Sequence, residues 1–295
     1  MDLCDPKDIG QLLLRHGFHF SRELGQNFLC DSTVPEQIAQ RSDITPETNV
    51  VEIGPGIGAL SRELCKRAKK VVAVELDHRL PPILQETMAG CGNFALVQGD
   101  VLKTDLLALC REQFSGGPVI ACANLPYYIT SPAIAALLES GCFQRVIVMV
   151  QKEAAQRICA RAGEKEYCAF SAQTAYYAAP SVILQVPRDR FIPQPKVDSV
   201  VLRLEVHAQP PVAGEKGEVF RAIRAGFANR RKTLVNGICM EYGKKITKDA
   251  AAALLKSMGL SENIRGEALS LEQFSELSVK LHNYFREIDG ISANY

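Results

Sequence analysis

Four short apolar runs in this sequence each end in residues that can bind a small polar ligand. The first run, residues 50–53, leads into a turn with glycines at positions 54, 56 and 58, and the next three runs end at Glu75, Asp100 and Asn124. A carboxylate can accept hydrogen bonds from two hydroxyl groups, and Glu75 lies 21 residues after Gly54, the usual spacing of an acid that binds a ribose. Asp100 can accept a hydrogen bond from an adenine amino group. The predicted ligand is therefore an adenosine derivative.

The glycine turn narrows the choice of ligand further. Its order is G-x-G-x-G, whereas the dinucleotide fingerprint G-x-G-x-x-G has its third glycine one residue later. A strand that enters such a turn and continues as a helix brings backbone N–H groups close to a ligand, although the glycines alone are equally typical of a purely structural turn. This departure from the dinucleotide fingerprint argues against a ligand with a pyrophosphate group. It therefore also argues against a nicotinamide-dependent dehydrogenase, the alternative function.

The tetrapeptide after the fourth run, Asn124-Leu125-Pro126-Tyr127, is suited to binding a planar amine. Pro126 favours an extended Leu125, which can direct the Leu125 carbonyl toward a pocket. Asn124 adds an amide oxygen and Tyr127 a flat aromatic face. Two acceptors and a stacking ring fit the exocyclic amino group of a base. An isolated motif of this kind would more often be a structural turn with a core tyrosine, but its place among the other strand ends favours a binding site.

An alternation of strands and helices must position these residues. Short runs rich in Val and Ile alternate with helical patterns from residue 50 onward, which indicates a mostly parallel sheet covered on both faces. In such a sheet, ligands bind beyond the carboxyl ends of the strands. Strands are predicted at residues 50–53, 71–74, 94–97, 119–122 and 145–150, and helices at 5–18, 34–40, 59–67 and after Arg79.

The C-terminal part differs in composition. Residues 207–214 contain two prolines and a glycine and are typical of a linker, so a domain boundary is predicted there. Helical patterns follow at residues 218–228, 232–240, 248–258 and 271–286. Residues 214–256 carry ten Lys or Arg against four acids, although the whole chain has a formal charge of only +1. Such a local excess is often only a solvated helix face, but it also fits docking on RNA phosphates, with Arg230, Arg231 and Lys232 as the best candidates.

The bulk composition excludes several classes of protein. The chain has 295 residues, 47% of them apolar and 23% charged, which is ordinary for a globular protein with room for two domains. No two of the ten cysteines form a C-x-x-C pair, so no metal site is predicted, and scattered cysteines fit a reducing cytoplasm. The N-terminus shows no signal or transit peptide, and no apolar stretch reaches the roughly 20 residues of a membrane span. We expect a cytoplasmic protein without a membrane or metal partner.

Taken together, the motifs resemble those of the small-subunit ribosomal RNA adenine N6,N6-dimethyltransferases, which use S-adenosylmethionine. The resemblance runs in order from residue 24 to residue 234, with no departure at a functional position. It is carried by Leu24-Gly25-Gln26-Asn27-Phe28-Leu29, Glu52-Ile53-Gly54-Pro55-Gly56-Ile57-Gly58, Val74-Glu75-Leu76-Asp77, Gly99-Asp100, Asn124-Leu125-Pro126-Tyr127-Tyr128-Ile129, Val150-Gln151-Lys152-Glu153, Phe191-Ile192-Pro193-Gln194-Pro195-Lys196-Val197-Asp198-Ser199-Val200 and Asn229-Arg230-Arg231-Lys232-Thr233-Leu234.

The resemblance implies an α/β fold, namely a Rossmann-like methyltransferase sheet with a small C-terminal all-helical domain. Residues 1–207 would then be the S-adenosylmethionine-binding catalytic domain, and residues 208–295 a helical RNA-docking domain. It also implies site roles. Cofactor contacts would come from Gln26, Asn27, Leu29, Gly54, Glu75, Asp100 and Asn124. Asn124 and the Leu125 carbonyl would hold the target N6, and Tyr127 and Phe191 would sandwich the flipped base. Without the resemblance, Phe191 would be interpreted as a hydrophobic plug.

The implied activity is the dimethylation of two adjacent adenines in a 3′-terminal hairpin loop of small-subunit ribosomal RNA, by a monomer acting on a pre-30S particle during ribosome biogenesis. Large-subunit methyltransferases that confer antibiotic resistance share the motifs, but the four helical patterns and the Pro193-Gln194-Pro195-Lys196 loop favour the small-subunit family. Enzymes that methylate a glutamine amide or a DNA adenine have a proline where this chain has Leu125. An assembly factor for which methylation is secondary stays an open alternative.

Overall fold

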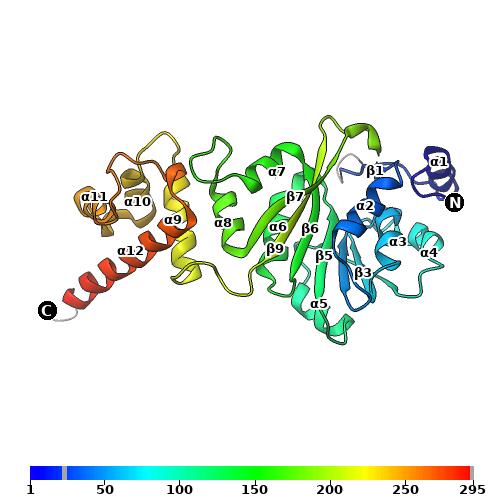
Figure 1. Ribbon diagram of the computed structural model, residues 1–295, viewed down its shortest axis with the longest axis horizontal. Coiled ribbons are helices and arrows are strands. Elements are labelled where there is room, and N and C mark those ends of the chain that lie inside the picture. Colours follow the sequence, from blue (N-terminus) through cyan, green and yellow to red (C-terminus); the bar gives the residue numbers. More distant parts are fainter. Residues whose placement is uncertain (22–24, 293–295) are drawn as a thin grey trace. The chain divides into compact units, whose positions relative to one another are not determined.

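The structure, a computed structural model, describes residues 1–21 and 25–292 (Figure 1). Leu24, the first residue of the motif around Gln26, lies outside them. The chain forms two compact units, one of residues 1–155 and 178–206 and one of residues 156–177 and 207–295. The predicted boundary at residues 207–208 lies beside the break after Val206. Residues 156–177, which were predicted as part of the first domain, belong to the second unit.

Within the described residues, the first unit contains a seven-stranded sheet in the order β4-β3-β2-β5-β6-β9-β7. The first five strands in this order are parallel to one another, and β9 is antiparallel to both β6 and β7. The prediction of a mostly parallel sheet is confirmed, although no strand was predicted for β7 or β9. The strands are β2 Asn49–Ile53, β3 Lys70–Glu75, β4 Phe94–Gln98, β5 Val119–Asn124, β6 Arg145–Gln151, β7 Ala178–Val186 and β9 Ser199–Val206.

The order of the strands determines where a ligand can bind. After β2, the chain adds β3 and β4 on one side of it and then β5 and β6 on the other. The order in which strands are added therefore reverses beside β2. Open parallel sheets bind ligands at such a point, beyond the carboxyl ends of the strands. Glu75 and Asn124 are the last residues of β3 and β5, and the glycine turn and Asp100 follow β2 and β4, so all four lie at this edge.

Helices of the first unit begin where local sequence favours it and pack by their apolar faces. The helix α1 (Pro6–Arg15) is capped by Asp5, whose side chain accepts hydrogen bonds from the N–H groups of Lys7 and Asp8 at 2.8 and 3.0 Å. In the core, helices α2 and α3 pack on the sheet. The remaining elements are α2 Thr33–Arg41, α3 Ala59–Cys65, α4 Pro81–Thr87, α5 Leu106–Gln113, η1 Tyr127–Ile129, α6 Thr130–Glu139 and η2 Arg188–Arg190, with a small ladder of β1 (Phe28–Leu29) and β8 (Phe191–Ile192). The helix α7 (Lys152–Cys159) begins in the first unit and ends in the second.

The second unit is helical, as predicted. Its core includes Ile223, Ile238, Leu255 and Phe274, each fully buried. A Cβ atom on Gly237 would lie 2.1 Å from the Ala225 carbonyl oxygen, so α9 and α10 approach as closely as their backbones allow. The helices are α8 Ala169–Tyr177, α9 Lys216–Phe227, α10 Leu234–Tyr242, α11 Lys248–Ser257 and α12 Leu271–Ser292, with short turns η3 Gly243–Lys245 and η4 Gly266–Ala268.

None of the helices in the described part of the chain combines the length and the apolar character that crossing a membrane requires.

Candidate active site

The four strand ends and the loop before β1 line one cavity. Its volume, including the open mouth, is about 1080 Å³, which is slightly above the general size range of small-molecule sites. Nearly all of the predicted cofactor and base contacts lie in its wall: Gln26, Asn27, Leu29, Gly54, Glu75, Asp100, Asn124, Leu125 and Tyr127. The fold therefore brings together residues that are spread over 100 positions of the sequence, because parallel strands end at one edge.

The glycine turn at the base of the cavity requires glycine for two different reasons. Gly56 and Gly58 have φ angles of +58° and +93°, which L side chains rarely adopt. A Cβ on Gly56 would also lie 3.2 Å from the Phe28 ring, and one on Gly58 would lie 2.8 Å from Met88 Sδ. By contrast, a Cβ on Gly54 would meet no atom within 4 Å. The backbone at Gly54 is thus open to a ligand, while the rest of the turn is packed against the protein.

Two buried carboxyl groups lie beside this turn. Glu52 is only 1% exposed, and its Oε2 atom has no hydrogen-bond partner among the described groups. Burial, together with a smaller effect of the nearby Glu75 and against the opposing effect of the Ser61 side chain, raises the pKa of Glu52 to about 8. Burial also raises the pKa of Glu75 to about 7, against the opposing effect of backbone N–H groups of Asp77 and Gly56. A cationic ligand with hydroxyl groups would stabilise both carboxylates.

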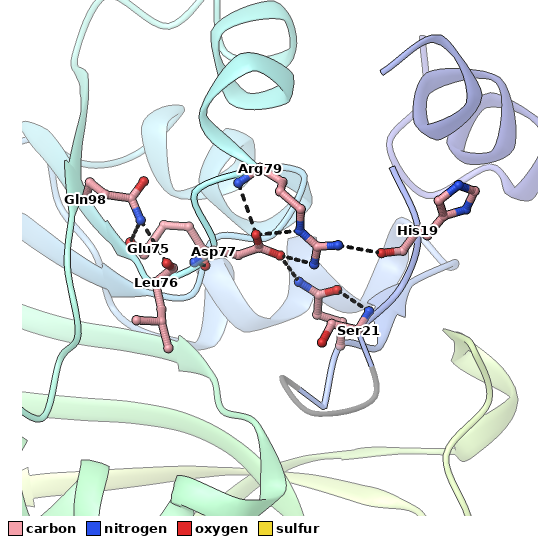
Figure 2. A network of polar contacts seen from close by, with 8 residues as sticks. His19, Ser21, Glu75, Leu76, Asp77, Arg79 and Gln98 are labelled. Atoms are coloured by element: carbon pink, nitrogen blue, oxygen red, sulfur yellow. Dashed lines mark hydrogen bonds and ion pairs between the residues drawn. The ribbon is translucent and has the colours of Figure 1, made fainter. Parts of the chain in front are cut away.

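The ends of β3 and β4 form a second part of the wall. The side-chain amide of Gln98 donates to the carbonyl oxygens of Glu75 and Leu76 at 2.8 and 2.9 Å, which fixes the two strand ends together (Figure 2). Leu76 and Val101 line the cavity next to Asp100, and Leu76 stays 48% exposed. An acid between two apolar side chains suits an adenine ring with its amino group. The sequence prediction missed Leu76 and Val101, although each directly follows a strand-end acid.

The Asn124 motif forms the third part. Asn124 is half-buried and its amide Nδ2 donates to the Asn27 carbonyl oxygen at 3.4 Å, which leaves Oδ1 as the available acceptor. Leu125 is 1% exposed, and its N–H donates to Met149 at 3.2 Å. The Tyr127 hydroxyl shares a hydrogen bond of 3.3 Å with Ser199. These contacts hold the motif at the end of β5; the role of the Leu125 carbonyl stays a prediction.

A network of polar contacts around the buried Asp77 connects the segment before β1 to the end of β3 (Figure 2). The Arg79 guanidinium binds both carboxylate oxygens of Asp77, at 2.8 and 2.6 Å, and also donates to the His19 carbonyl oxygen. Gln26 Nε2 donates to Asp77 at 2.7 Å, and Gln26 Oε1 accepts from the Ser21 N–H at 2.9 Å. Although burial opposes ionisation, the hydrogen bonds from Arg79 and Gln26 lower the pKa of Asp77 to about 2.

The network changes the interpretation of Gln26. Gln26 lines the cavity as predicted, but both ends of its amide are bound to the protein. Asp77 also donates its N–H to Glu75 Oε1 at 2.7 Å. One buried residue, Asp77, therefore holds Gln26 through its carboxylate and the predicted ribose-binding carboxylate of Glu75 through its backbone N–H, although the sequence did not single it out as a site residue.

Phe191 does not occupy its expected position. It pairs with Leu29 in the β1–β8 ladder, is only 3% exposed and belongs to the same core cluster as Leu29. It is not among the described residues that line the cavity. Burial of the ring beneath β1 is more favourable than exposure beside the charged η2 turn, so in this structure Phe191 and Tyr127 do not form a sandwich.

The three predicted RNA contacts lie in the second unit, in the loop between α9 and α10. All three side chains are exposed. Arg230, however, forms an ion pair with Glu267 at 3.2 Å and donates to the carbonyl oxygens of Lys165 and Tyr167. Arg230 thus anchors the loop, and Arg231 and Lys232 are better placed to reach a phosphate.

Comparison with known proteins shows to which family the chain belongs. The family described as "Ribosomal RNA adenine dimethylase" matches residues 17–281. The chain belongs to this family. A relative from Geobacillus thermodenitrificans named ribosomal RNA small subunit methyltransferase A is 43% identical over 97% of this chain and 99% of its own length. Another protein of that name, from Lachnoclostridium phytofermentans, is 42% identical over 94% and 96%.

Solved structures agree with the fold. A dimethyladenosine transferase from Plasmodium falciparum has a TM-score of 0.73 at 25% identity and covers 87% of this chain and 98% of its own. The 23S rRNA methyltransferase ErmE has a TM-score of 0.66 at 26% identity, with coverage of 86% and 99%. The predicted resemblance, the Rossmann-like methyltransferase fold, the adenine dimethylation of ribosomal RNA and S-adenosylmethionine as cofactor are confirmed.

The residues of the cavity fit this cofactor. S-adenosylmethionine carries positive charge on its sulfur and amino group, two ribose hydroxyls and an adenine amine. The cavity offers the unpartnered Oε2 of Glu52, the carboxylate of Glu75, the open backbone of Gly54, and Asp100 beside Leu76. The assignment of each residue to one part of the cofactor stays a prediction.

We predict that Glu52→Gln stabilises the cofactor-free protein more at pH 8.5 than at pH 5. A carboxyl whose pKa is raised from 4.5 to about 8 stabilises the fold below its unfolded pKa and loses that contribution as pH rises through 8. The glutamine amide carries no charge to bury. The melting temperature of Glu52→Gln, measured by calorimetry, should exceed that of the wild type at pH 8.5 by about 2–4 °C per kcal/mol of stabilisation. No such gain is expected at pH 5.

The exposed Glu36 on α2 provides the control, since Glu36→Gln should show no such pH dependence. An equal difference between Glu52→Gln and the wild type at pH 5 and pH 8.5 would contradict the assigned pKa.

We also predict that Asp77→Asn loosens the segment before β1 and weakens cofactor binding. The new amide nitrogen cannot accept hydrogen bonds from Arg79 or Gln26, and hydrogen bonds to charged groups contribute about 1.5–3 kcal/mol. Amide hydrogen exchange of the segment should accelerate, and calorimetry should show an affinity for S-adenosylmethionine lower by about 10-fold or more. The exposed Asp189→Asn should change neither quantity. Unchanged exchange in Asp77→Asn would show that the network does not hold the segment.

Proposed function

We propose that this chain transfers methyl groups from S-adenosylmethionine to the N6 amines of two adjacent adenines in a 3′-terminal hairpin loop of small-subunit ribosomal RNA, giving N6,N6-dimethyladenine. The observation that carries the proposal is that Asn124 lies in the same cavity as Glu75 and Asp100. A relative named for the small subunit is 43% identical to this chain, against 26% for the 23S rRNA methyltransferase ErmE, which favours small-subunit RNA. The protein would act as a cytoplasmic monomer on a pre-30S particle during ribosome biogenesis.

The chemistry requires orientation more than acid–base catalysis. The lone pair of the adenine N6 is delocalised into the ring, so the amine is a poor nucleophile until its geometry becomes tetrahedral. Two acceptors, Asn124 Oδ1 and the Leu125 carbonyl oxygen, would hold the two N–H groups and direct the lone pair at the methyl carbon. When bound, S-adenosylmethionine supplies a methyl group on a positively charged sulfur. Alignment of this kind can lower the barrier by about 7–11 kcal/mol.

No strong base is needed in this scheme. As the N–C bond forms and the C–S bond breaks, the nitrogen becomes cationic and its proton becomes acidic enough to pass to water. Glu75 would bind the ribose, Asp100 the adenine amine and Gly54 the amino-acid end of the cofactor. A second transfer to the same nitrogen requires room for one methyl group, after the base rotates or rebinds.

The helical second unit would dock on RNA by its charge. Arg231 and Lys232 are exposed in the α9–α10 loop, whereas Arg230 is tied to Glu267. Docking by phosphate contacts carries no base sequence information, so the choice of target would come from RNA shape and from the cavity.

Asn124→Ala tests the catalytic assignment. We expect transfer of labelled methyl groups to unmethylated small-subunit particles to fall by at least about 100-fold, as when a single stabilising contact at a reacting group is lost. Particle binding should stay nearly intact, because the docking residues are unchanged. Asn263→Ala, an exposed position in the second unit, is the control and should retain full activity. Dimethyladenine formed by Asn124→Ala at the wild-type rate would refute the assignment.

A paired change of Arg231 and Lys232 to Gln tests the docking surface. Loss of two phosphate contacts should weaken particle binding and reduce the slope of log K against log salt by about 0.7–0.9 per contact. A variant with Lys7 and Lys69 changed to Gln removes the same charge from exposed positions of the first unit and should keep the wild-type slope. If both double variants show the same slope, binding depends on net charge and not on this loop.

A further inference from the structure

Tyr128 is the only exposed aromatic residue in the described part of the chain. Its relative exposure is 56%, while every other described Phe and Tyr is buried or half-buried. It belongs to the η1 turn, directly after Tyr127, and lines the cavity that holds the predicted cofactor contacts. Exposure of a large aromatic surface to water raises the free energy of the protein, and a ligand that covers the surface lowers it again.

The position of the ring is fixed by its neighbours on one side. A Cβ atom on Gly25 would lie 3.7 and 3.8 Å from Cδ1 and Cε1 of Tyr128. Gly25 has a φ of +59°, so its backbone can take this course beside the ring without a side chain in between. The turn begins at Pro126, whose φ is restricted. The ring thus lies close to the Gly25 backbone while more than half of the residue's surface stays exposed.

Exposure along the motif shows which base could reach which residue. Leu125 is 1% exposed, Asn124 and Tyr127 are half-buried, and Tyr128 lies at the mouth. An adenine whose N6 reaches Asn124 must lie in the inner part, beside Tyr127. The next base along the strand stays outside, at the level of Tyr128. Phe191, the other predicted stacking residue, is buried in the core and does not compete for that base.

We propose that Tyr128 is a stacking subsite for the unpaired base next to the adenine being methylated. This inference rests on the proposed function and deepens it. Stacking on an aromatic ring tolerates any base, but a purine offers the larger overlap, which fits two adjacent adenines that take turns as target and neighbour. Tyr128 acts as a positioning residue: it contributes to RNA affinity and to the alignment of the target, and not to cofactor binding.

The test is a cycle of protein and RNA changes. Dissociation constants are measured for a small-subunit 3′-terminal hairpin RNA and for the same RNA with an abasic nucleotide on either side of the target adenine. The proteins are the wild type, Tyr128→Ala and Tyr128→Phe. Val182→Ala, at an exposed position of the outer strand β7, is the control. The affinity of each protein for S-adenosylmethionine is measured by calorimetry.

We expect Tyr128→Ala to weaken binding of the intact hairpin by roughly 5- to 100-fold, the range for one base–aromatic stack. Tyr128→Phe and Val182→Ala should stay within about 2-fold of the wild type, because the ring is retained or is not involved. On the RNA that lacks the neighbouring base, wild type and Tyr128→Ala should bind equally well, since coupled changes are not additive. Cofactor affinity should be the same for all four proteins.

Two results would overturn the inference. One is a loss in Tyr128→Ala that is the same on intact and abasic RNA, which would make the ring structural. The other is a parallel loss of S-adenosylmethionine affinity, which would make Tyr128 part of the cofactor wall. The proposed function fails separately, if the wild type binds the hairpin with this Tyr128 dependence but yields no dimethyladenine on small-subunit particles.

Discussion

The left-handed backbone between β2 and α3 is the constraint on which the site depends. Gly56 and Gly58 need positive φ angles, and their missing side chains allow Phe28 and Met88 to pack against the turn. The start of α3, the strand β1 and the end of α4 therefore all pack at this turn. Because the strand order reverses beside β2, the turn after β2 opens into the cavity beside β3 and β5. Its backbone at Gly54 can then approach a cofactor closely, without any chemistry of its own.

The charges around the turn complement this geometry. Glu52 and Glu75 are buried with pKa values raised to about 8 and about 7, whereas Asp77, two residues beyond Glu75, is held ionised by Arg79. Two carboxyl groups of the cavity wall, Glu52 and Glu75, are therefore costly to ionise, whereas Asp77, which is not among the lining residues, has its charge compensated already. A cationic, hydroxyl-rich cofactor compensates the first two, while the third keeps the covering segment in position. Cofactor binding and the order of that segment are coupled through these acids.

Much of this could be predicted from sequence, because fully buried parallel strands have continuous Val and Ile runs and their carboxyl ends meet. The outer strand β7 was missed since its burial does not alternate regularly and since it includes Pro180 and an irregularity near Val182. Phe191 was misplaced because only its pairing with Leu29, far away in the chain, decides between core and site. The role of Asp77 depends on Gln26, 51 positions earlier in the sequence. The exposure of Tyr128 depends on how the described residues pack around it. Neither feature leaves a local sequence pattern.

The most direct test of the account is to map modified nucleotides in both ribosomal RNAs by mass spectrometry, after unmethylated ribosomal subunits are incubated with the protein and S-adenosylmethionine. The account predicts N6,N6-dimethyladenine at two adjacent positions in one hairpin loop near the 3′ end of the small-subunit RNA. Dimethyladenine confined to large-subunit RNA, or no dimethyladenine at all, would contradict it.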